Sequence, residues 1–139
     1  MTADAGSAFE VGATAQRSWT VEAEHLAPAH GSGTADVLAT PALLAFCEET
    51  ARSIVDPLLP ERQATVGTFL EFHHTAATPP GVRVTVTARL VDVDGQRLRF
   101  ELTAHDPFEE IGRGTHERFL VDSDRFLTKV SRKAKSDGN

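Results

Sequence analysis

The alternation of apolar and polar residues marks one helical segment in the first half of the chain. From residue 40 to residue 55 apolar side chains recur at about the helical period of 3.6 residues. Thr40-Pro41 is a typical helix start, because proline at the first helical position loses no hydrogen bond. The hydroxyl of Thr40 is expected to cap this helix. Asp56 precedes a proline and so avoids the helical region, which predicts that the helix ends at Val55.

After Ala64 the period changes to two, as in strands with one buried face. Asp94-Gly95 is typical of a tight hairpin turn between two such strands. The expected strands are Ser18 to Ala23, 66–78, 82–90, 98–104 and 111–121. Strands joined by hairpins run antiparallel, and a single apolar helix must pack on one face of their sheet. The pattern therefore predicts an α+β domain with one long helix cradled by a curved antiparallel sheet of about five strands.

Length and composition favour one globular domain. The chain has 139 residues, of which 40% are hydrophobic and 24% charged, a balance that fits a single domain over residues 1–139. Residues 1–12 and 133–139 are expected to be flexible tails. Apolar runs are too short to span a membrane, and the N-terminus does not resemble a secretory signal. Cys47 is the single cysteine and forms no internal disulfide, so a cytoplasmic protein is expected.

The charges are unevenly distributed. The net charge is −6, which disfavours a nucleic-acid-binding domain. From Arg125 onward the chain nevertheless carries five basic residues and one acidic residue. Two interpretations of this basic end stay open: it is solvated surface, or it contacts a small phosphorylated ligand.

Glu48 is the first candidate for chemistry. It lies at the border of the apolar face of the expected helix, whereas Glu49 points to the opposite side. A partly buried carboxylate is costly unless it is paired or used. The alternative is a carboxylate at the rim that reaches solvent or an arginine.

His74 is the second candidate. In the strand over residues 66–78, the face with Val66, Thr68, Leu70, Phe72, His74 and Ala76 is the more apolar. His74 is therefore expected to point inward and His73 outward. An inward histidine is either a core residue or a proton-transfer group. A bulge before His74 would reverse this assignment of faces.

Thr40 is the third candidate, because a hydroxyl at a helix N-terminus lies where developing negative charge is favoured. Hydroxyl, carboxylate and imidazole together suit acyl transfer. A serine-hydrolase elbow and a phosphate-binding glycine loop are both missing from the sequence. The histidines lack the spacing of metal ligands, and we expect no metal and no cofactor.

Three stretches resemble the bacterial fluoroacetyl-CoA thioesterase family. They are Gly67-Thr68 with the run from His74 to Gly81, Ala39-Thr40 followed by Glu48, and Glu110 to Arg118. The resemblance extends in order from about Arg17 to Arg132. The run from His74 to Gly81 is its most specific part.

This resemblance implies a hotdog fold and a homodimer with active sites between the subunits. By position, Thr40, Glu48 and His74 match the catalytic threonine, glutamate and histidine of the family. Gly67 matches a glycine lining the acyl pocket, and Arg118 an arginine near that pocket. The implied reaction is hydrolysis of a short- or medium-chain acyl-CoA, with coenzyme A as part of the substrate.

The chain also departs from the family. The fluoroacetate-specific enzyme has a phenylalanine-bearing lid between its first strand and its helix, and residues 27–35 contain no phenylalanine here. We therefore expect thioesterase activity without fluoroacetyl selectivity. Two alternatives stay open: an acyl-CoA hydratase or dehydratase, and a non-catalytic protein that binds acyl-CoA or another small ligand.

Overall fold

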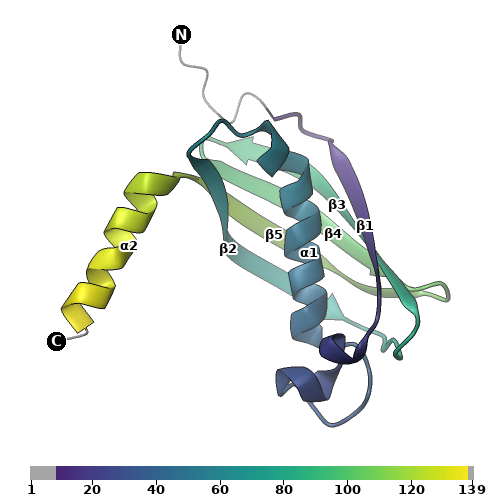
Figure 1. Ribbon diagram of the computed structural model, residues 1–139. Coiled ribbons are helices and arrows are strands. Elements are labelled where there is room, and N and C mark those ends of the chain that lie inside the picture. Colours follow the sequence, from purple (N-terminus) through teal and green to yellow (C-terminus); the bar gives the residue numbers. More distant parts are fainter. Residues whose placement is uncertain (1–8, 138–139) are drawn as a thin grey trace.

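The computed structural model describes residues 9–137, which form one sheet, one long helix packed on it, and a second helix at the C-terminal end (Figure 1). The elements in chain order are β1 (Thr14–Thr20), η2 (Ala23–His25), η3 (Ala27–His30), α1 (Thr40–Val55), η4 (Asp56–Leu58), β2 (Gln63–His74), β3 (Arg83–Asp94), β4 (Arg97–His105), β5 (Glu110–Asp122) and α2 (Ser123–Asp137).

The five strands form one antiparallel sheet in the order β1-β3-β4-β5-β2. The predicted hairpin joins β3 and β4, but its loop is Gly95-Gln96, because Asp94 still pairs with Arg97; Gly95 lies in the left-handed region at φ +61°. This order leaves β1 and β2 as the two edges of the sheet. An exposed edge presents unpaired backbone groups to any further strand.

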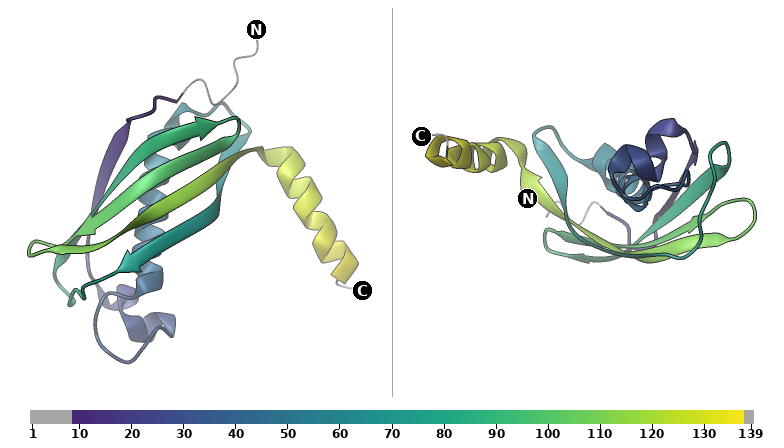
Figure 2. Two further views of the ribbon diagram at one scale, coloured as in Figure 1. Left: turned by 180° about the vertical axis from the view of Figure 1, so that it is seen from behind. Right: turned by 90° about the horizontal axis from the view of Figure 1, so that it is seen from below.

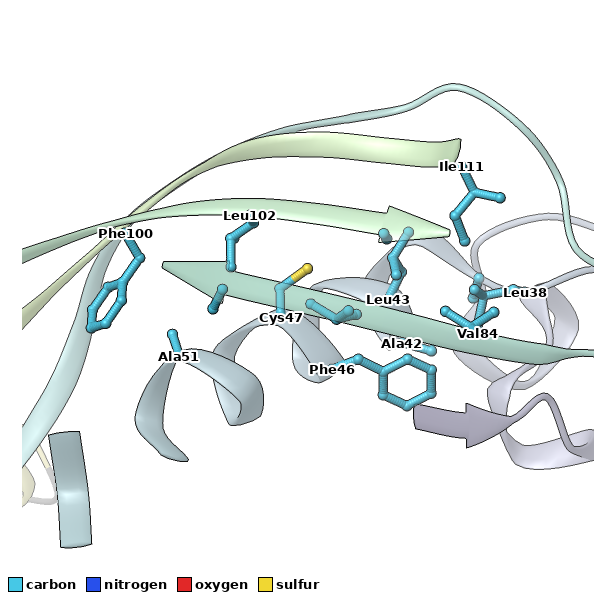
Figure 3. Close-up of a cluster of buried hydrophobic side chains, with 14 of the residues drawn as sticks. Leu38, Ala42, Leu43, Phe46, Cys47, Ala51, Val84, Phe100, Leu102 and Ile111 are labelled. Atoms are coloured by element: carbon cyan, nitrogen blue, oxygen red, sulfur yellow. The ribbon is translucent and has the colours of Figure 1, made fainter. Parts of the chain in front are cut away.

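The sheet curves around α1, as the view from below shows (Figure 2). Leu43, Cys47 and Ala51 of α1 are fully buried and point toward the sheet, where they meet side chains such as Phe100 and Leu102 (Figure 3). Burial of this apolar stripe against the concave face is the main driving force for the layered arrangement. The predicted α+β arrangement, one long helix cradled by five antiparallel strands, is confirmed.

A β-bulge in β2 changes the predicted assignment of faces. Gly67 pairs with Arg118 and Phe69 with Glu117, so Thr68 is the extra residue of the bulge. After the bulge Leu70, Phe72 and His74 point to the concave face, and His73 is exposed as predicted. Before the bulge the alternation is reversed: Gly67 faces inward, and the inward assignment of Val66 and Thr68 was wrong.

The bounds of three strands also differ from the prediction, and β3 extends to Asp94 rather than ending at residue 90. β1 spans Thr14–Thr20 rather than residues 18–23, because it pairs with β3 along its whole length. Being an edge strand with mostly exposed side chains, it carries little apolar alternation. β2 ends at His74 rather than at Thr78.

The C-terminal basic segment is the helix α2, which the sequence pattern did not predict. It stands away from the sheet in all three views (Figures 1 and 2). Residues 133–137, expected in a flexible tail, belong to this helix, whereas 138–139 lie outside the described residues. Of the expected N-terminal tail, residues 1–8 also lie outside them, but Phe9 is buried in the core. No helix among the described residues is long and apolar enough to span a membrane.

Candidate active site

Thr40 and His74 form a direct side-chain pair. Thr40 is the first residue of α1 and His74 the last residue of β2, and Thr40 Oγ1 lies 2.8 Å from His74 Nδ1. The predicted capping role of Thr40 was wrong: Ala39 occupies the N-cap position, and α1 has no side-chain cap. The hydroxyl is bonded to the imidazole instead of to the helix backbone.

A cavity of about 300 Å³ opens beside this pair. Its wall comes from the segment that precedes α1 and the segment that follows β2, and it includes Ala27, Val37, Leu38, Ala39, Ala76 and Ala77. These side chains are small or aliphatic, while Thr40 and His74 supply polar groups. A pocket of this kind suits a small apolar group attached to a polar reacting centre.

The environment of His74 favours the neutral imidazole. Burial, partly offset by the backbone of Ala76, lowers the pKa of this ring below its ordinary value. Nε2 is buried, and it forms no hydrogen bond within the described part of the chain. A neutral ring bonded to a hydroxyl can accept the proton of that hydroxyl or of a water molecule.

Glu48 belongs to a second cluster, two turns further along α1. Arg118 Nη1 donates to Glu48 Oε2 at 3.1 Å, and the Glu48 side chain is 44% exposed. Gly67 lies directly against this carboxylate, since a Cβ built on Gly67 would be 2.5 Å from Glu48 Oε2. Glu49 is exposed and pairs with Arg17 on the outer side of the helix. Within one chain Glu48 therefore matches the alternative considered from the sequence, a carboxylate at the rim that reaches an arginine.

Two further residues of this cluster were missed by the sequence analysis. Thr65 accepts from Arg118 through both its hydroxyl and its backbone carbonyl, and His116 Nε2 lies 3.2 Å from Arg118 Nη1. His116 and Arg118 share the inward face of β5 with the buried Leu120. Their spacing of two positions from Leu120, which puts all three side chains on one strand face, was the signal that could have revealed them.

The five residues singled out from the sequence thus fall into two groups in one chain. Thr40 and His74 form one group, and Glu48, Gly67 and Arg118 form the other. Thr40 and Glu48 are eight residues apart on α1, which places their Cα atoms about 12 Å apart along the helix axis. Within a single chain the hydroxyl, carboxylate and imidazole do not form one catalytic set.

Two other features bear on the chemistry. Within residues 9–137 no group of three or more histidine, cysteine, aspartate and glutamate side chains is arranged to hold a metal ion. Cys47 is fully buried in the core, and burial together with the nearby Glu48 raises the pKa of its thiol to about 12. A thiol in this environment is not a nucleophile near neutral pH.

Comparisons with known proteins identify the family of this chain. A model of the fluoroacetyl-CoA-specific thioesterase family, FlK, matches residues 21–124. The fluoroacetyl-CoA thioesterase of Streptantibioticus cattleyicolor is 42% identical over 98 residues, which cover 70% of each chain.

The solved structures give the same result for the fold. A structure of the fluoroacetyl-CoA thioesterase FlK superimposes with a TM-score of 0.84 at 34% identity, covering 90% of this chain and 97% of FlK. A hot-dog-like protein from Thermanaerovibrio acidaminovorans superimposes with a TM-score of 0.85 at 26% identity, covering 92% of this chain and 95% of that protein. The chain therefore has the hotdog fold and belongs to the fluoroacetyl-CoA-specific thioesterase family.

Proposed function

We propose that this protein is an acyl-CoA thioesterase that hydrolyses short- or medium-chain acyl-CoA to the free acid and coenzyme A. The observation that carries the proposal is the 2.8 Å bond between Thr40 and His74 beside a cavity with several small aliphatic side chains in its wall. A hydroxyl on a neutral imidazole is the arrangement that acyl transfer requires. The family relationship supports the same reaction.

In this proposal the thioester carbonyl lies at the N-terminus of α1. Backbone N–H groups of the first turn and the helix dipole stabilise the negative charge that develops on the carbonyl oxygen. Either Thr40 or a water molecule attacks the carbonyl carbon, and His74 accepts the proton released from the attacking oxygen. The carbon–sulfur bond then breaks, and His74 returns the proton to the leaving thiolate. Attack by Thr40 would add an acyl-threonine intermediate, which water hydrolyses.

Glu48 takes part only if a second chain brings it to the Thr40–His74 pair. β2 is an edge of the sheet, and edges of this kind are commonly covered by another strand. We infer a homodimer in which the β2 strands of two copies pair antiparallel across a two-fold axis.

The register of such a pair decides which groups meet. An axis at Glu71 pairs residues of like face and places His74 of one subunit opposite the Gly67-Thr68 bulge of the other. Gly67 lies against Glu48 in its own chain. Each active site would then contain Thr40 and His74 from one subunit. The other subunit would supply Glu48, which is hydrogen-bonded to Arg118.

Helix α2 is the candidate for holding the phosphates of coenzyme A. Arg125, Lys129 and Arg132 lie on one exposed face of this helix, because their spacing of four and three residues matches the helical period. These cations line a shallow hollow together with Asp124 and Thr128. Three cations on one face suit the phosphates of the nucleotide.

The acyl preference follows from the cavity wall. The segment from Ala27 to Ala35 contains no phenylalanine, tyrosine or tryptophan, and Gly31 and Gly33 both have positive φ. The wall therefore has small side chains where an aromatic lid would reduce the volume. We propose turnover of acyl groups longer than acetyl and no selectivity for fluoroacetyl.

The test is release of free thiol from a series of acyl-CoA esters of increasing chain length. We expect kcat/KM to pass through a maximum at a short or medium chain, with fluoroacetyl-CoA and acetyl-CoA hydrolysed at comparable rates. Thermal stabilisation by these esters without thiol release would support a binding protein instead. Loss of conjugation from an enoyl-CoA without thiol release would support a hydratase.

A further inference from the structure

A buried polar network lies beneath Glu48, between β2 and β5. Arg118 and His116 are 4% and 1% exposed, respectively, and both point to the concave face of the sheet. Charged and polar groups in such a position are costly unless their hydrogen-bonding capacity is satisfied. Each buried group of the network therefore needs hydrogen-bond partners among its neighbours.

The hydrogen bonds of His116 define its tautomer. Nδ1 lies 2.7 Å from the backbone carbonyl oxygen of Phe69, and a carbonyl only accepts, so Nδ1 carries a proton. Nε2 lies 3.2 Å from Nη1 of Arg118, and a guanidinium only donates, so Nε2 carries a lone pair. Together the two contacts require the neutral ring protonated at Nδ1. Burial of the ring and the adjacent guanidinium both lower the pKa of His116, which is consistent with this form.

His116 completes the set of acceptors around Arg118. Nε donates to Thr65 Oγ1 at 2.9 Å, and Nη2 donates to the backbone carbonyl of Thr65 at 3.0 Å. The two hydrogens of Nη1 are directed to His116 and to Glu48. The guanidinium is thus held on three sides by fixed acceptors, and its fourth contact is the Glu48 carboxylate.

The geometry around Glu48 explains why this support matters. The Glu48 side chain is 44% exposed and has several rotatable bonds, so nothing in its own helix holds it in one place. Glu48 Oε2 lies 4.0 Å from His116 Nε2, too far for a direct hydrogen bond. The hydrogen bonds that connect His116 to the carboxylate therefore pass through Arg118.

We propose that His116 is a positioning residue of the reaction: as a fixed acceptor it orients the Arg118 guanidinium, which in turn holds Glu48 in place. The inference rests on the proposed thioesterase function, in which Glu48 is a catalytic group. In this role His116 acts through Arg118 and does not contact the substrate.

The chain offers a matched pair of substitutions for the test. The amide of glutamine reaches the position of the ring Nε2, so His116→Gln can still accept from Arg118. The amide of asparagine reaches the position of Nδ1, so His116→Asn retains the bond to Phe69 and loses the acceptor. Phe100→Leu is the packing control, because the Phe100 ring stacks near His116 at 6.1 Å between centroids and makes no polar contact with the network.

The expected result is a separation of kcat from stability. His116→Asn should lower kcat roughly ten- to a hundredfold, the scale of effect that a misplaced catalytic group produces, with little change in KM. His116→Gln should remain within about threefold of the wild type, and Phe100→Leu should lower Tm and leave kcat within the same range. Equal losses of kcat in the Gln and Asn variants, or no loss in the Asn variant, would overturn the proposal.

A second measurement needs neither a variant nor turnover. The ¹⁵N chemical shifts of the His116 ring in the wild-type protein report which nitrogen carries the proton. We expect Nδ1 protonated and Nε2 unprotonated at neutral pH. A ring that is doubly protonated, or protonated at Nε2, overturns the positioning role even if the enzyme is active. Absence of thiol release by the wild type, with the expected tautomer, instead contradicts the proposed function.

Discussion

Thr40 Oγ1 and His74 Nδ1 lie 2.8 Å apart although 34 positions separate the two residues in the chain. The contact joins the first residue of α1 to the last residue of β2, so it exists only when the helix packs on the sheet with its N-terminus beside that edge strand. The same geometry excludes Thr40 as the helix cap, because Ala39 occupies the N-cap position.

The first prediction concerns His74. Replacement His74→Ala should lower kcat at least about a hundredfold, because it removes the group that transfers the proton. Tm measured alongside shows whether the variant is folded. A folded variant with an unchanged rate would exclude His74 as the base.

The pH profile of kcat/KM tests the same role. A base must be neutral to accept a proton, so activity is present above the pKa of His74 and is lost as the pH falls through it. Burial lowers this pKa, so the acidic limb should lie below the ordinary range of a free histidine. The residual activity of His74→Ala should lack this limb, and a profile with the same limb in both proteins would assign it to another group.

The second prediction concerns the space at Gly67. A methyl group there would lie 2.5 Å from Glu48 Oε2, so Gly67→Ala should displace the carboxylate and lower kcat roughly tenfold or more. The Glu48→Ala background is the control, because in it the methyl group no longer meets the carboxylate. Gly67→Ala should cost little further activity there, and additive losses in the double variant would show that Gly67 acts independently of Glu48.

The third prediction concerns the assembly of the site from two chains. Glu48→Ala and His74→Ala are each expected to be nearly inactive as homodimers. A heterodimer of the two variants can be isolated with two different tags. If each site is shared between subunits, this heterodimer contains one intact site and one site that lacks both groups. About half of the wild-type activity should then return. A heterodimer as inactive as its parents, or a fully active monomer, would place the whole site within one chain.

The fourth prediction concerns the basic face of α2. Replacing Arg125, Lys129 and Arg132 with glutamine should raise KM for acyl-CoA and weaken its dependence on salt, with kcat nearly unchanged. The control is the same replacement at Arg83 and Arg89, two exposed arginines of β3. An unchanged KM in the α2 variant would leave this face as solvated surface.

The fifth prediction concerns Cys47. Because the thiol is fully buried and its pKa is raised to about 12, it should resist thiol reagents in the native protein and react only after unfolding. Reaction with a chromogenic disulfide, with and without denaturant, measures this directly. Rapid labelling of the native protein would contradict the buried position. The same resistance keeps Cys47 from contributing to a thiol-release assay.

Much of the fold could be predicted because its signals are local. The helix end at Val55 and the hairpin turn at Gly95 each depend on neighbouring residues, and both were confirmed. The expected reason for the helix end was wrong, because Asp56 keeps helical dihedrals (φ −58°, ψ −39°). β1 was misplaced because an edge strand with exposed side chains carries little apolar alternation. Helix α2 was missed because its charge pattern is equally typical of solvated chain.

By itself the sequence determined the order of α1 and the five strands, because the hydrophobic period is a local signal. It also determined the inward position of His74 and the border position of Glu48, because side-chain direction follows from local backbone period. Only the tertiary structure decided which of these groups meet. The bulge at Thr68 turns Gly67 toward Glu48, and the packing of α1 bonds Thr40 to His74. The tertiary structure also brings Arg118 into contact with both Glu48 and His116. Such contacts depend on strand register and on the docking of distant segments, which no local pattern encodes.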